Sequence, residues 1–342
     1  MRPIKVLVVD DSIVFRELLV RNLGKDPSVQ VVATAGDAYA ARDAILAYHP
    51  DVMTLDIELP RMNGIEFLRK LMPQYPLRTV VISALSDKVF DALNAGAVDF
   101  VAKPAVSSRE QLEDFVRNDL LVKIKIAASA HIDNIRKASD TGVHGHLSVK
   151  KNNLIVAIGA STGGTEAILS VVKEFGTDIP GIVAVQHMPP GFTKIYAKRL
   201  NDICRIQVKE AESGDLVIPG HMLIAPGGDQ HMRLVKVSGE YRVEIKPGPK
   251  VNGHCPSVDV LFDSVAKAAG ADAVGIILTG MGGDGAKGLL AMRNAGAKTI
   301  GQDESTCVVY GMPKTAYDLG AVERQEKLSD IARRTYAVLN TM

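Results

Sequence analysis

Residues 4–12 of the chain read IKVLVVDDS, an apolar run that ends in two aspartates. Four more apolar runs follow, and stretches with helical apolar spacing, such as Ile13–Leu23 and Ala38–Tyr48, separate them. Short runs rich in Val and Ile are typical of strands buried on both faces of a parallel sheet. We therefore expect a five-stranded, doubly wound α/β domain at the N-terminus. Its expected strands are Lys5–Val9, Val29–Ala35, Val52–Asp56, Thr79–Ser83 and Asp99–Ala102.

Polar residues stand at the ends of these strands. Asp10 and Asp11 follow the first strand, Asp56 ends the third, Ser83 ends the fourth and Lys103 follows the fifth. Parallel strands of one sheet end at one edge, where sites of such folds form. Clustered carboxylates repel one another unless a cation such as Mg²⁺ binds them, and a hydroxyl and an ammonium can hold phosphoryl oxygens. The pattern favours phosphoryl transfer onto a carboxylate over five unrelated helix caps.

This segment resembles the receiver domain of two-component response regulators over residues 4–125. The resemblance implies that Asp56 accepts the phosphoryl group. It implies that Mg²⁺ is held by Asp10, Asp11, Asp56 and the backbone carbonyl of Glu58. The stretches that carry the resemblance are Val9–Ser12, Leu55–Gly64, Ser83–Ala84 and Lys103–Pro104.

The same resemblance assigns roles to three more residues. Ser83 and Lys103 would contact the phosphoryl group. Phe100 would take the place of the family's aromatic switch residue, where many members have Tyr. A histidine kinase would supply the phosphoryl group.

The composition excludes several classes of protein. Lys and Arg number 40 against 39 Asp and Glu, which argues against a strongly basic nucleic-acid binder. Trp is absent and aromatic residues make up 5%, so few side chains could stack on bases. No apolar segment approaches the ~20 residues that span a bilayer, so we expect no membrane insertion. Three unpaired cysteines favour a reducing compartment, and we expect a cytoplasmic protein.

Residues 131–152 lack apolar periodicity toward their end and are expected to link two domains. A helix is expected over Gln111–Ile132. The domains would span residues 1–130 and 153–342. In the second, a parallel α/β sheet and a small antiparallel addition are expected. The expected sheet strands are Leu154–Ile158, Gly181–Gln186 and Ala273–Leu278, and those of the addition are Met222–Ala225, Met232–Val237 and Tyr241–Ile245.

A serine lies in the glycine-rich turn after the first of these strands. The turn, Gly159–Gly164, reads GASTGG and fits the G-x-S-x-G pattern of a serine nucleophile, Ser161. A helix N-terminus behind such a turn offers N–H groups to a developing oxyanion. A serine nucleophile needs a base, and His187 follows the next strand, at the same sheet edge as Ser161.

The third group should be an acid at another strand end. Asp284 lies in the glycine-rich turn after Ala273–Leu278, while Asp303 competes for this role. We favour Asp284 because three neighbouring glycines suggest a close approach of the backbone. The order Ser, His, Asp differs from that of α/β-hydrolases, which points to a convergent triad on another fold. Three further histidines lie in or beside the antiparallel addition, and the sequence does not place them relative to this site: His221, His231 and His254.

With the receiver segment, the second domain resembles the catalytic domain of the chemotaxis protein-glutamate methylesterases, the CheB family. The stretches that carry this resemblance are Ile158–Gly164, Val185–Pro189, Ile224–Gly228, Pro256–Asp259 and Leu278–Gly285. It implies Ser161 as nucleophile, His187 as base and Asp284 as orienting acid. It also implies oxyanion stabilisation at the Met281 backbone, with Thr162 beside the nucleophile.

The implied reaction is hydrolysis of glutamate γ-methyl esters on methyl-accepting chemotaxis receptors, with release of methanol. Deamidation of receptor glutamines would use the same chemistry, and the esterase site would need no cofactor. The implied partners are these receptors and the chemotaxis histidine kinase, and the protein would be a monomer. The unphosphorylated receiver would restrain the esterase.

Two other classes of function remain open at this stage. One is a response regulator whose second domain only binds; no helix-turn-helix with a basic helix is visible, which disfavours DNA. The other is a dinucleotide-dependent enzyme that uses Gly159–Gly164 as a phosphate loop, although the turn does not fit G-x-G-x-x-G.

Overall fold

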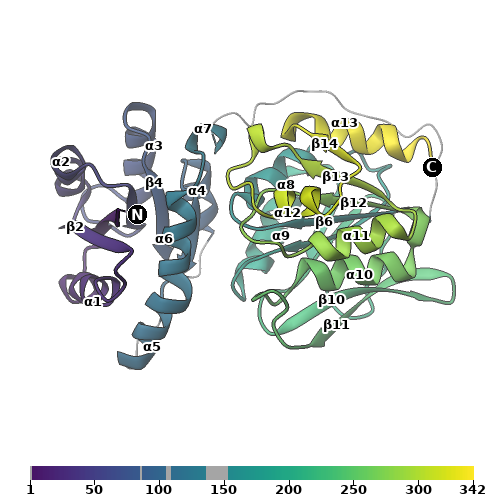
Figure 1. Cartoon of the computed structure of the whole chain (residues 1–342), viewed down its shortest axis with the longest axis horizontal. Helices are drawn as coiled ribbons and strands as arrows, with labels where there is room; N and C mark the ends of the chain where they lie inside the picture. The colour runs from purple at the N-terminus through teal and green to yellow at the C-terminus, as the bar shows by residue number, and fades with distance from the viewer. Residues whose placement is uncertain (1, 85–86, 105–108, 136–152) are drawn as a thin grey trace. The chain divides into compact units, whose positions relative to one another are not determined.

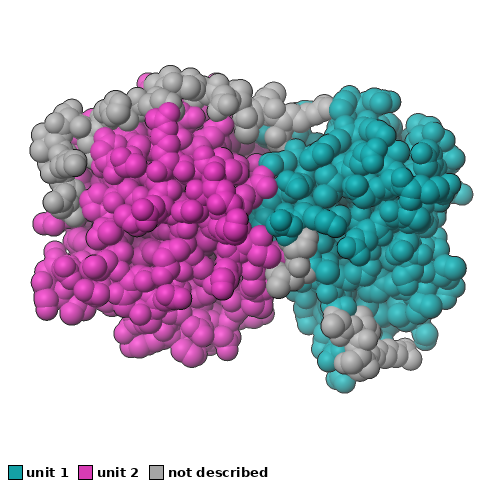
Figure 2. Space-filling model, turned by 180° about the vertical axis from the view of Figure 1, so that it is seen from behind, with its two compact units in different colours: residues 1–136 teal, residues 137–342 magenta. Residues whose placement is uncertain are grey.

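The computed structural model describes residues 2–84, 87–104, 109–135 and 153–342 (Figure 1). The chain divides into two compact units, residues 1–136 and 137–342, coloured separately in Figure 2. Of the linker predicted over 131–152, only residues 131–135 are described, and they include the short helix α7 (Ile132–Ile135). Among the described residues, no helix has the length and apolar character needed to span a membrane.

The first unit holds a five-stranded parallel sheet with the strand order β2-β1-β3-β4-β5. All five predicted strands are present, and their bounds differ from the predicted ones by at most one residue. The middle strands β1 and β3 are buried along most of their length, as the apolar runs indicated. The strands are β1 (Ile4–Val9), β2 (Val29–Ala35), β3 (Val52–Asp56), β4 (Arg78–Ser83) and β5 (Asp99–Ala102).

Helices connect and cover these strands. Ser12, Asp37 and Asn63 cap three of them, because each side-chain oxygen accepts a backbone N–H of the first turn. The helix predicted over Gln111–Ile132 ends earlier, at Ala128, where Ser129 turns back to the carbonyl of Ile126. The helices are α1 (Ile13–Leu23), α2 (Ala38–Tyr48), α3 (Gly64–Gln74), α4 (Lys88–Asn94), α5 (Arg109–Phe115), the π-helical η1 (Val116–Leu120) and α6 (Leu121–Ala128).

The second unit holds a seven-stranded parallel sheet with the order β14-β13-β12-β6-β7-β9-β8 and a separate antiparallel pair, β10 and β11. This architecture confirms the predicted fold class. The sheet strands are β6 (Ile155–Ala160), β7 (Gly181–Gln186), β8 (Gln207–Glu210), β9 (His221–Ile224), β12 (Ala273–Ile277), β13 (Lys298–Gln302) and β14 (Arg324–Glu326). The antiparallel pair consists of β10 (Gln230–Val237) and β11 (Glu240–Pro247).

One strand assignment was wrong. The segment Met222–Ala225 was expected in the antiparallel addition, but β9 pairs in parallel with β7 and β8 inside the main sheet. Its residues Met222, Leu223 and Ile224 are all buried, as in a strand covered on both faces, whereas burial alternates along β11. An unbroken apolar run was therefore the signal for the parallel sheet.

Helices cover both faces of this sheet. In Figure 1, α8 and α13 lie on one face and α10 and α11 on the other. A Cβ at Gly159 of β6 would collide with Val258 and Phe262 of α10, so glycine allows α10 to approach the strand. The helices are α8 (Gly164–Val172), α9 (Phe192–Ile203), α10 (Val258–Ala268), α11 (Ala286–Asn294), α12 (Met312–Asp318) and α13 (Leu328–Leu339), with short 3₁₀ turns η2 (Gly270–Asp272) and η3 (Glu304–Thr306).

The strand order fixes where a site can form. The chain continues from β6 to β7 on one side of β6, whereas β12 lies on its other side. The connections after β6 and β12 therefore leave in opposite directions, and doubly wound sheets form their sites at such a switch point, at the carboxyl ends of the strands. Ser161 follows β6 and Asp284 follows β12 at this switch point.

Candidate active site and receiver site

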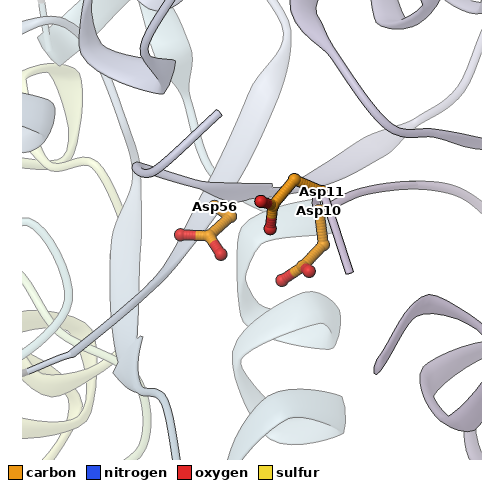
Figure 3. A group of neighbouring side chains, drawn as sticks. All are labelled: Asp10, Asp11 and Asp56. Atoms are coloured by element: carbon orange, nitrogen blue, oxygen red, sulfur yellow. The ribbon is translucent and has the colours of Figure 1, made fainter. Parts of the chain in front are cut away.

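The first unit gathers three carboxylates at one sheet edge. The pairing of β1 with β3 places Asp10 next to Asp56, and Asp11 lies beside them (Figure 3). One carboxylate oxygen from each residue lies within 4.8 Å of the others. Asp10 and Asp56 are buried, whereas Asp11 is exposed. This donor set suits a hard divalent cation such as Mg²⁺, which prefers carboxylate and water ligands.

Lys103 supplies a positive charge inside this cluster. Its Nζ donates to Oδ2 of Asp10 at 2.8 Å and also to Asp56. Burial raises the pKa of Asp10, and the hydrogen bond and charge of Lys103 offset this only in part. Burial acts to lower the pKa of Lys103, but its two carboxylate partners raise it overall. One ammonium therefore leaves the cluster short of positive charge, as expected for a site that also takes a metal ion.

The other predicted receiver residues, Glu58, Ser83 and Phe100, lie on or just after strands of the same sheet. Ser83 is buried at the end of β4, and its hydroxyl donates to the carbonyl of Ala84 at 3.0 Å. The backbone N–H of Glu58 donates to Oδ1 of Asp56 at 3.0 Å, and its side chain is exposed. Phe100 is buried on β5. The structure thus joins Lys103 to the acidic cluster and leaves the Ser83 hydroxyl turned to the backbone.

In the second unit, Ser161 lies where β6 turns into α8. Its backbone N–H donates to the carbonyl of Thr279 at 3.0 Å, which ties the turn to the segment after β12. Gly163 has a φ of 75°, a conformation that favours glycine and lets the chain enter the helix directly. This turn places Ser161 at the switch point between β6 and β12, where 7% of the residue is exposed.

His187 lies next to Ser161 on the neighbouring strand end. Ala160 pairs with Gln186 in the sheet, and the N–H of His187 donates to the carbonyl of Ala160 at 3.1 Å. Its Nε2 lies 2.8 Å from Oδ2 of Asp284. Its Nδ1 is buried and has no hydrogen-bond partner among the residues that the structure describes. A neutral ring that donates through Nε2 therefore keeps Nδ1 available to accept a proton.

Asp284 is almost fully buried and is surrounded by donors at the start of α10. Burial acts to raise its pKa, but the hydrogen bond and charge of His187 and the bonds from Asn252 and Ser257 hold that pKa well below the usual range. The carboxylate is therefore charged at neutral pH and can orient His187. Its hydrogen-bond donors are Nε2 of His187, Nδ2 of Asn252, Oγ of Ser257 and the backbone N–H groups of Val258 and Asp259.

The residues of the expected oxyanion site lie on two adjoining turns. Thr162 is buried beside Ser161, and the hydroxyl of Thr279 donates to its carbonyl at 3.1 Å. The turn after β12 is anchored at Gly280, whose carbonyl accepts the N–H of Met312 at 2.7 Å. Met281 follows with 47% of its surface exposed, and a Cβ on Gly280 would touch Ser161. The Met281 backbone thus follows a glycine that is packed directly on Ser161.

The competing acid lies elsewhere. Oδ1 of Asp303 accepts the N–H of Ser305 at 3.0 Å and caps the turn η3. No described contact joins Asp303 to His187, whereas Asp284 bonds to it directly. Of the two acids left open by the sequence, the structure therefore brings Asp284 to the histidine.

Sequence reasoning missed two residues that contact this cluster. Nδ2 of Asn252 bridges Asp284 at 2.9 Å and Asp259 at 2.7 Å. The ring of His254 stacks on that of His187. Both belong to the turn Val251–His254, whose Asn-Gly dipeptide is typical of tight hairpin turns and could have located it. The other unplaced histidines bond to backbone: His221 to the carbonyl of Pro219, and His231 to that of Pro249.

The fold and these sites define a two-unit protein: a response-regulator-type α/β unit with an acidic cluster, followed by an α/β unit with a serine, histidine and aspartate at its switch point. Residues 6–117 match the family model of the response regulator receiver domain, and residues 156–335 match that of CheB methylesterase. The chain therefore belongs to the CheB methylesterase family.

Two relatives match this chain over nearly its whole length, and a solved structure matches about half of it. A "protein-glutamate methylesterase/protein-glutamine glutaminase 2" of Syntrophomonas wolfei is 60% identical and aligns with 100% of this chain and 99% of its own. A protein-glutamate methylesterase/protein-glutamine glutaminase of Salmonella typhi is 46% identical over 99% and 98% of the two chains. The crystal structure of the Thermotoga maritima CheB methylesterase catalytic domain is 38% identical, with a TM-score of 0.53, and covers 54% of this chain and 98% of its own.

These matches decide between the open classes of function. The matched family is one of hydrolases with a receiver domain, and its model covers the segment in which a DNA-binding or dinucleotide-binding domain was considered. The family's receiver domain also implies a Mg²⁺ site of the kind that the cluster Asp10, Asp11 and Asp56 provides.

Proposed function

We propose that this protein hydrolyses glutamate γ-methyl esters of chemotaxis receptors and deamidates receptor glutamines, under control of phosphorylation at Asp56. Ser161 is the nucleophile, His187 the base and Asp284 the acid that orients it. The observation that carries the proposal is the pairing of His187 with Asp284 through Nε2. This leaves a buried Nδ1, without a partner in the described part of the chain, beside the strand end that holds Ser161.

The proposed chemistry is acyl transfer in two steps. Oγ of Ser161 attacks the γ-carbonyl carbon while its proton passes to Nδ1 of His187. The carbonyl oxygen becomes an oxyanion that the Met281 N–H and the turn at Thr162 stabilise. The C–O bond to the methoxy group then breaks, and the proton on Nδ1 leaves with it as methanol. Water attacks the acyl-serine by the same route, which restores Ser161 and leaves a glutamate γ-carboxylate on the receptor.

A glutamine side chain reacts through the same groups. The leaving group is then ammonia, which takes the proton from Nδ1 of His187. Asp284 keeps its negative charge throughout, because its pKa lies below the usual range. It thereby stabilises the imidazolium that forms in both reactions. The proposed steps need only these side chains, backbone N–H groups and water, so we propose that the esterase site works without a cofactor.

The proposed control begins at the receiver site. A phosphohistidine of the kinase transfers its phosphoryl group to a carboxylate oxygen of Asp56. Lys103 and Ser83 contact the transferred oxygens, and Phe100 responds as the switch residue. Asp10, Asp11, Asp56 and the Glu58 carbonyl would hold Mg²⁺, which supplies positive charge to the phosphoryl oxygens when bound. The cluster of three carboxylates with a single ammonium, Lys103, supports this assignment, since the negative charge exceeds the positive charge.

The test of the proposed function is methanol release from membranes that carry methylated receptors, with and without a small-molecule phosphodonor. We expect release by the wild type and a faster rate with the phosphodonor. Glutamine deamidation is followed in parallel by mass spectrometry of receptor peptides. A wild-type protein that releases no methanol from methylated receptors would refute the proposal.

Asp56→Asn should remove the response to the phosphodonor and leave the basal rate unchanged. Asparagine keeps the shape of the side chain but offers no carboxylate to phosphorylate, and Asp56 belongs to the first unit, whereas the esterase residues belong to the second. The measurement is the initial rate of methanol release with and without phosphodonor, together with acid-labile phosphate on the protein. Asp43→Asn, at an exposed position of α2, is the matched control. Normal phosphate incorporation into Asp56→Asn would place the acceptor elsewhere.

A fragment that begins at Lys151 should be faster than the unphosphorylated full chain and should ignore the phosphodonor. This expectation follows from the restraint by the receiver that the family resemblance implies. A preference of ~1.4 kcal/mol for the restrained state limits the gain to about tenfold. Initial rates on the same receptor membranes test it. A folded fragment that is slower than the full chain would show that the receiver assists catalysis.

A further inference from the structure

We propose that His254 is a positioning residue that holds the ring of the base His187 by stacking on its face; this inference rests on the proposed function. The two imidazole rings lie nearly parallel, with an interplanar angle of 8° and ring centroids 3.7 Å apart. The contact therefore acts on the plane of His187 and occupies neither of its nitrogens.

His187 needs such a restraint because, among the described residues, a single hydrogen bond sets the direction of its ring. Nε2 is bound to Asp284, and Nδ1 has no partner among the described residues. A ring held through one nitrogen can tilt about that hydrogen bond, and the tilt moves Nδ1, the atom that takes the proton of Ser161. A flat group against the ring face opposes this tilt while leaving Nδ1 open to the serine. Displacement of a catalytic group by about 1 Å can cost ~100-fold in rate.

A tight backbone turn fixes the position of His254 beside His187. Val251 and His254 exchange two backbone hydrogen bonds of 2.9 Å, which close the turn between them. Asn252 and Gly253 at its centre have φ values of 52° and 84°, as a type I′ turn requires. The same turn directs Nδ2 of Asn252 onto Asp284. One rigid turn thus contacts both the base and the acid that orients it.

The test compares three variants of the full chain under identical phosphodonor conditions. We expect His254→Ala to lower kcat for methanol release by about 10- to 100-fold with KM within twofold, since only the base is misplaced. His254→Phe, which keeps a flat ring but no ring nitrogen, should stay within about threefold of the wild type. His221→Ala is the matched control. His221 is the first residue of β9 and lies at the amino ends of the strands, whereas the site lies at their carboxyl ends, so this variant should keep the wild-type kcat.

A second readout does not depend on receptors. In long-range ¹⁵N–¹H correlation spectra, His187 should appear as the tautomer protonated at Nε2, with its signals assigned by their loss in His187→Asn. His254→Ala should broaden these signals through ring motion, and His254→Phe should restore them. If the wild type releases no methanol while His254→Ala broadens the His187 signals and His254→Phe restores them, the proposed function fails and the restraint of the His187 ring by the stack stands.

Several outcomes would overturn the positioning role. Wild-type kcat in a folded His254→Ala would do so. Equal losses in folded His254→Ala and His254→Phe would assign the role to the ring nitrogens and not to the stack. If the alanine variant does not fold, the phenylalanine variant decides, since it keeps the ring volume. Failure of both to fold would make His254 a purely structural residue, which also contradicts the proposal.

Discussion

Ser161→Ala should lower the rate of methanol release by about 10⁶-fold, to the limit of detection, because loss of a serine nucleophile removes the acyl-enzyme route altogether. The fold should survive. The Ser161 contacts that hold the turn together come from its backbone: its N–H donates to Thr279 and its carbonyl accepts from Gly164 and Gln186. Alanine keeps all of these bonds.

The measurement is the initial rate of methanol release from methylated receptor membranes, with circular dichroism and thermal unfolding as checks of the fold. Ser305→Ala is the matched control, because Ser305 is an exposed serine of the same unit in the turn η3. It should keep the wild-type rate. Near-normal methanol release by a folded Ser161→Ala would show that another residue is the nucleophile.

Asp284→Asn should lower the rate by about 10⁴-fold, less than the loss of the serine, because the nucleophile and base remain but the base loses its orienting charge. An amide at this position offers one acceptor oxygen where the carboxylate offers two. Its NH₂ group would face either the donors to Oδ1, such as Ser257, or the donors to Oδ2, such as the Val258 N–H. We therefore also expect a lower unfolding temperature for this variant.

Asp303→Asn provides the matched control for this change. Asp303 is the acid that the sequence left in competition, and its side chain caps η3, where asparagine caps almost equally well. Its rate should stay within about twofold of the wild type. Loss of methanol release in Asp303→Asn, with Asp284→Asn fully active, would exchange the two assignments.

The strands of both units could be predicted closely because their signal is local. Val29–Ala35, Val52–Asp56 and Gly181–Gln186 begin and end in the structure at the residues that the apolar runs indicated. The edge strands β8 and β14 were missed, since four or three residues with mixed polarity carry no such signal. The interior strand β13 was missed as well, because its sequence KTIGQ contains no apolar run. The strand β9 was recognised but placed in the wrong sheet, because the residues of a strand do not specify which strand it pairs with.

The residues of the candidate sites also fall into two groups, those that the sequence reveals and those that only the fold brings to the site. Ser161, His187 and Asp56 could be picked out because each chemical side chain stands directly at a strand end, where parallel sheets gather their functional groups. Asn252 and His254 could not, because they lie in a turn between the antiparallel pair and α10, and only the fold brings that turn onto the site. Lys103 was assigned to the phosphoryl group, and the structure adds its bonds to Asp10 and Asp56.

The sequence by itself determined the class of fold, the order of the units and the chemical groups at the strand ends, because apolar periodicity and strand-end residues are properties of short segments. The tertiary structure alone decided which of these groups meet. His187 and Asp284 stand 97 positions apart, and they meet because β12 lies beside β6 and the start of α10 surrounds the carboxylate with donors. Asp303 also follows a strand end, but that strand is β13, which the strand order places one position further from β6 than β12. Strand order and helix packing follow from the burial of the whole chain, which no short segment specifies.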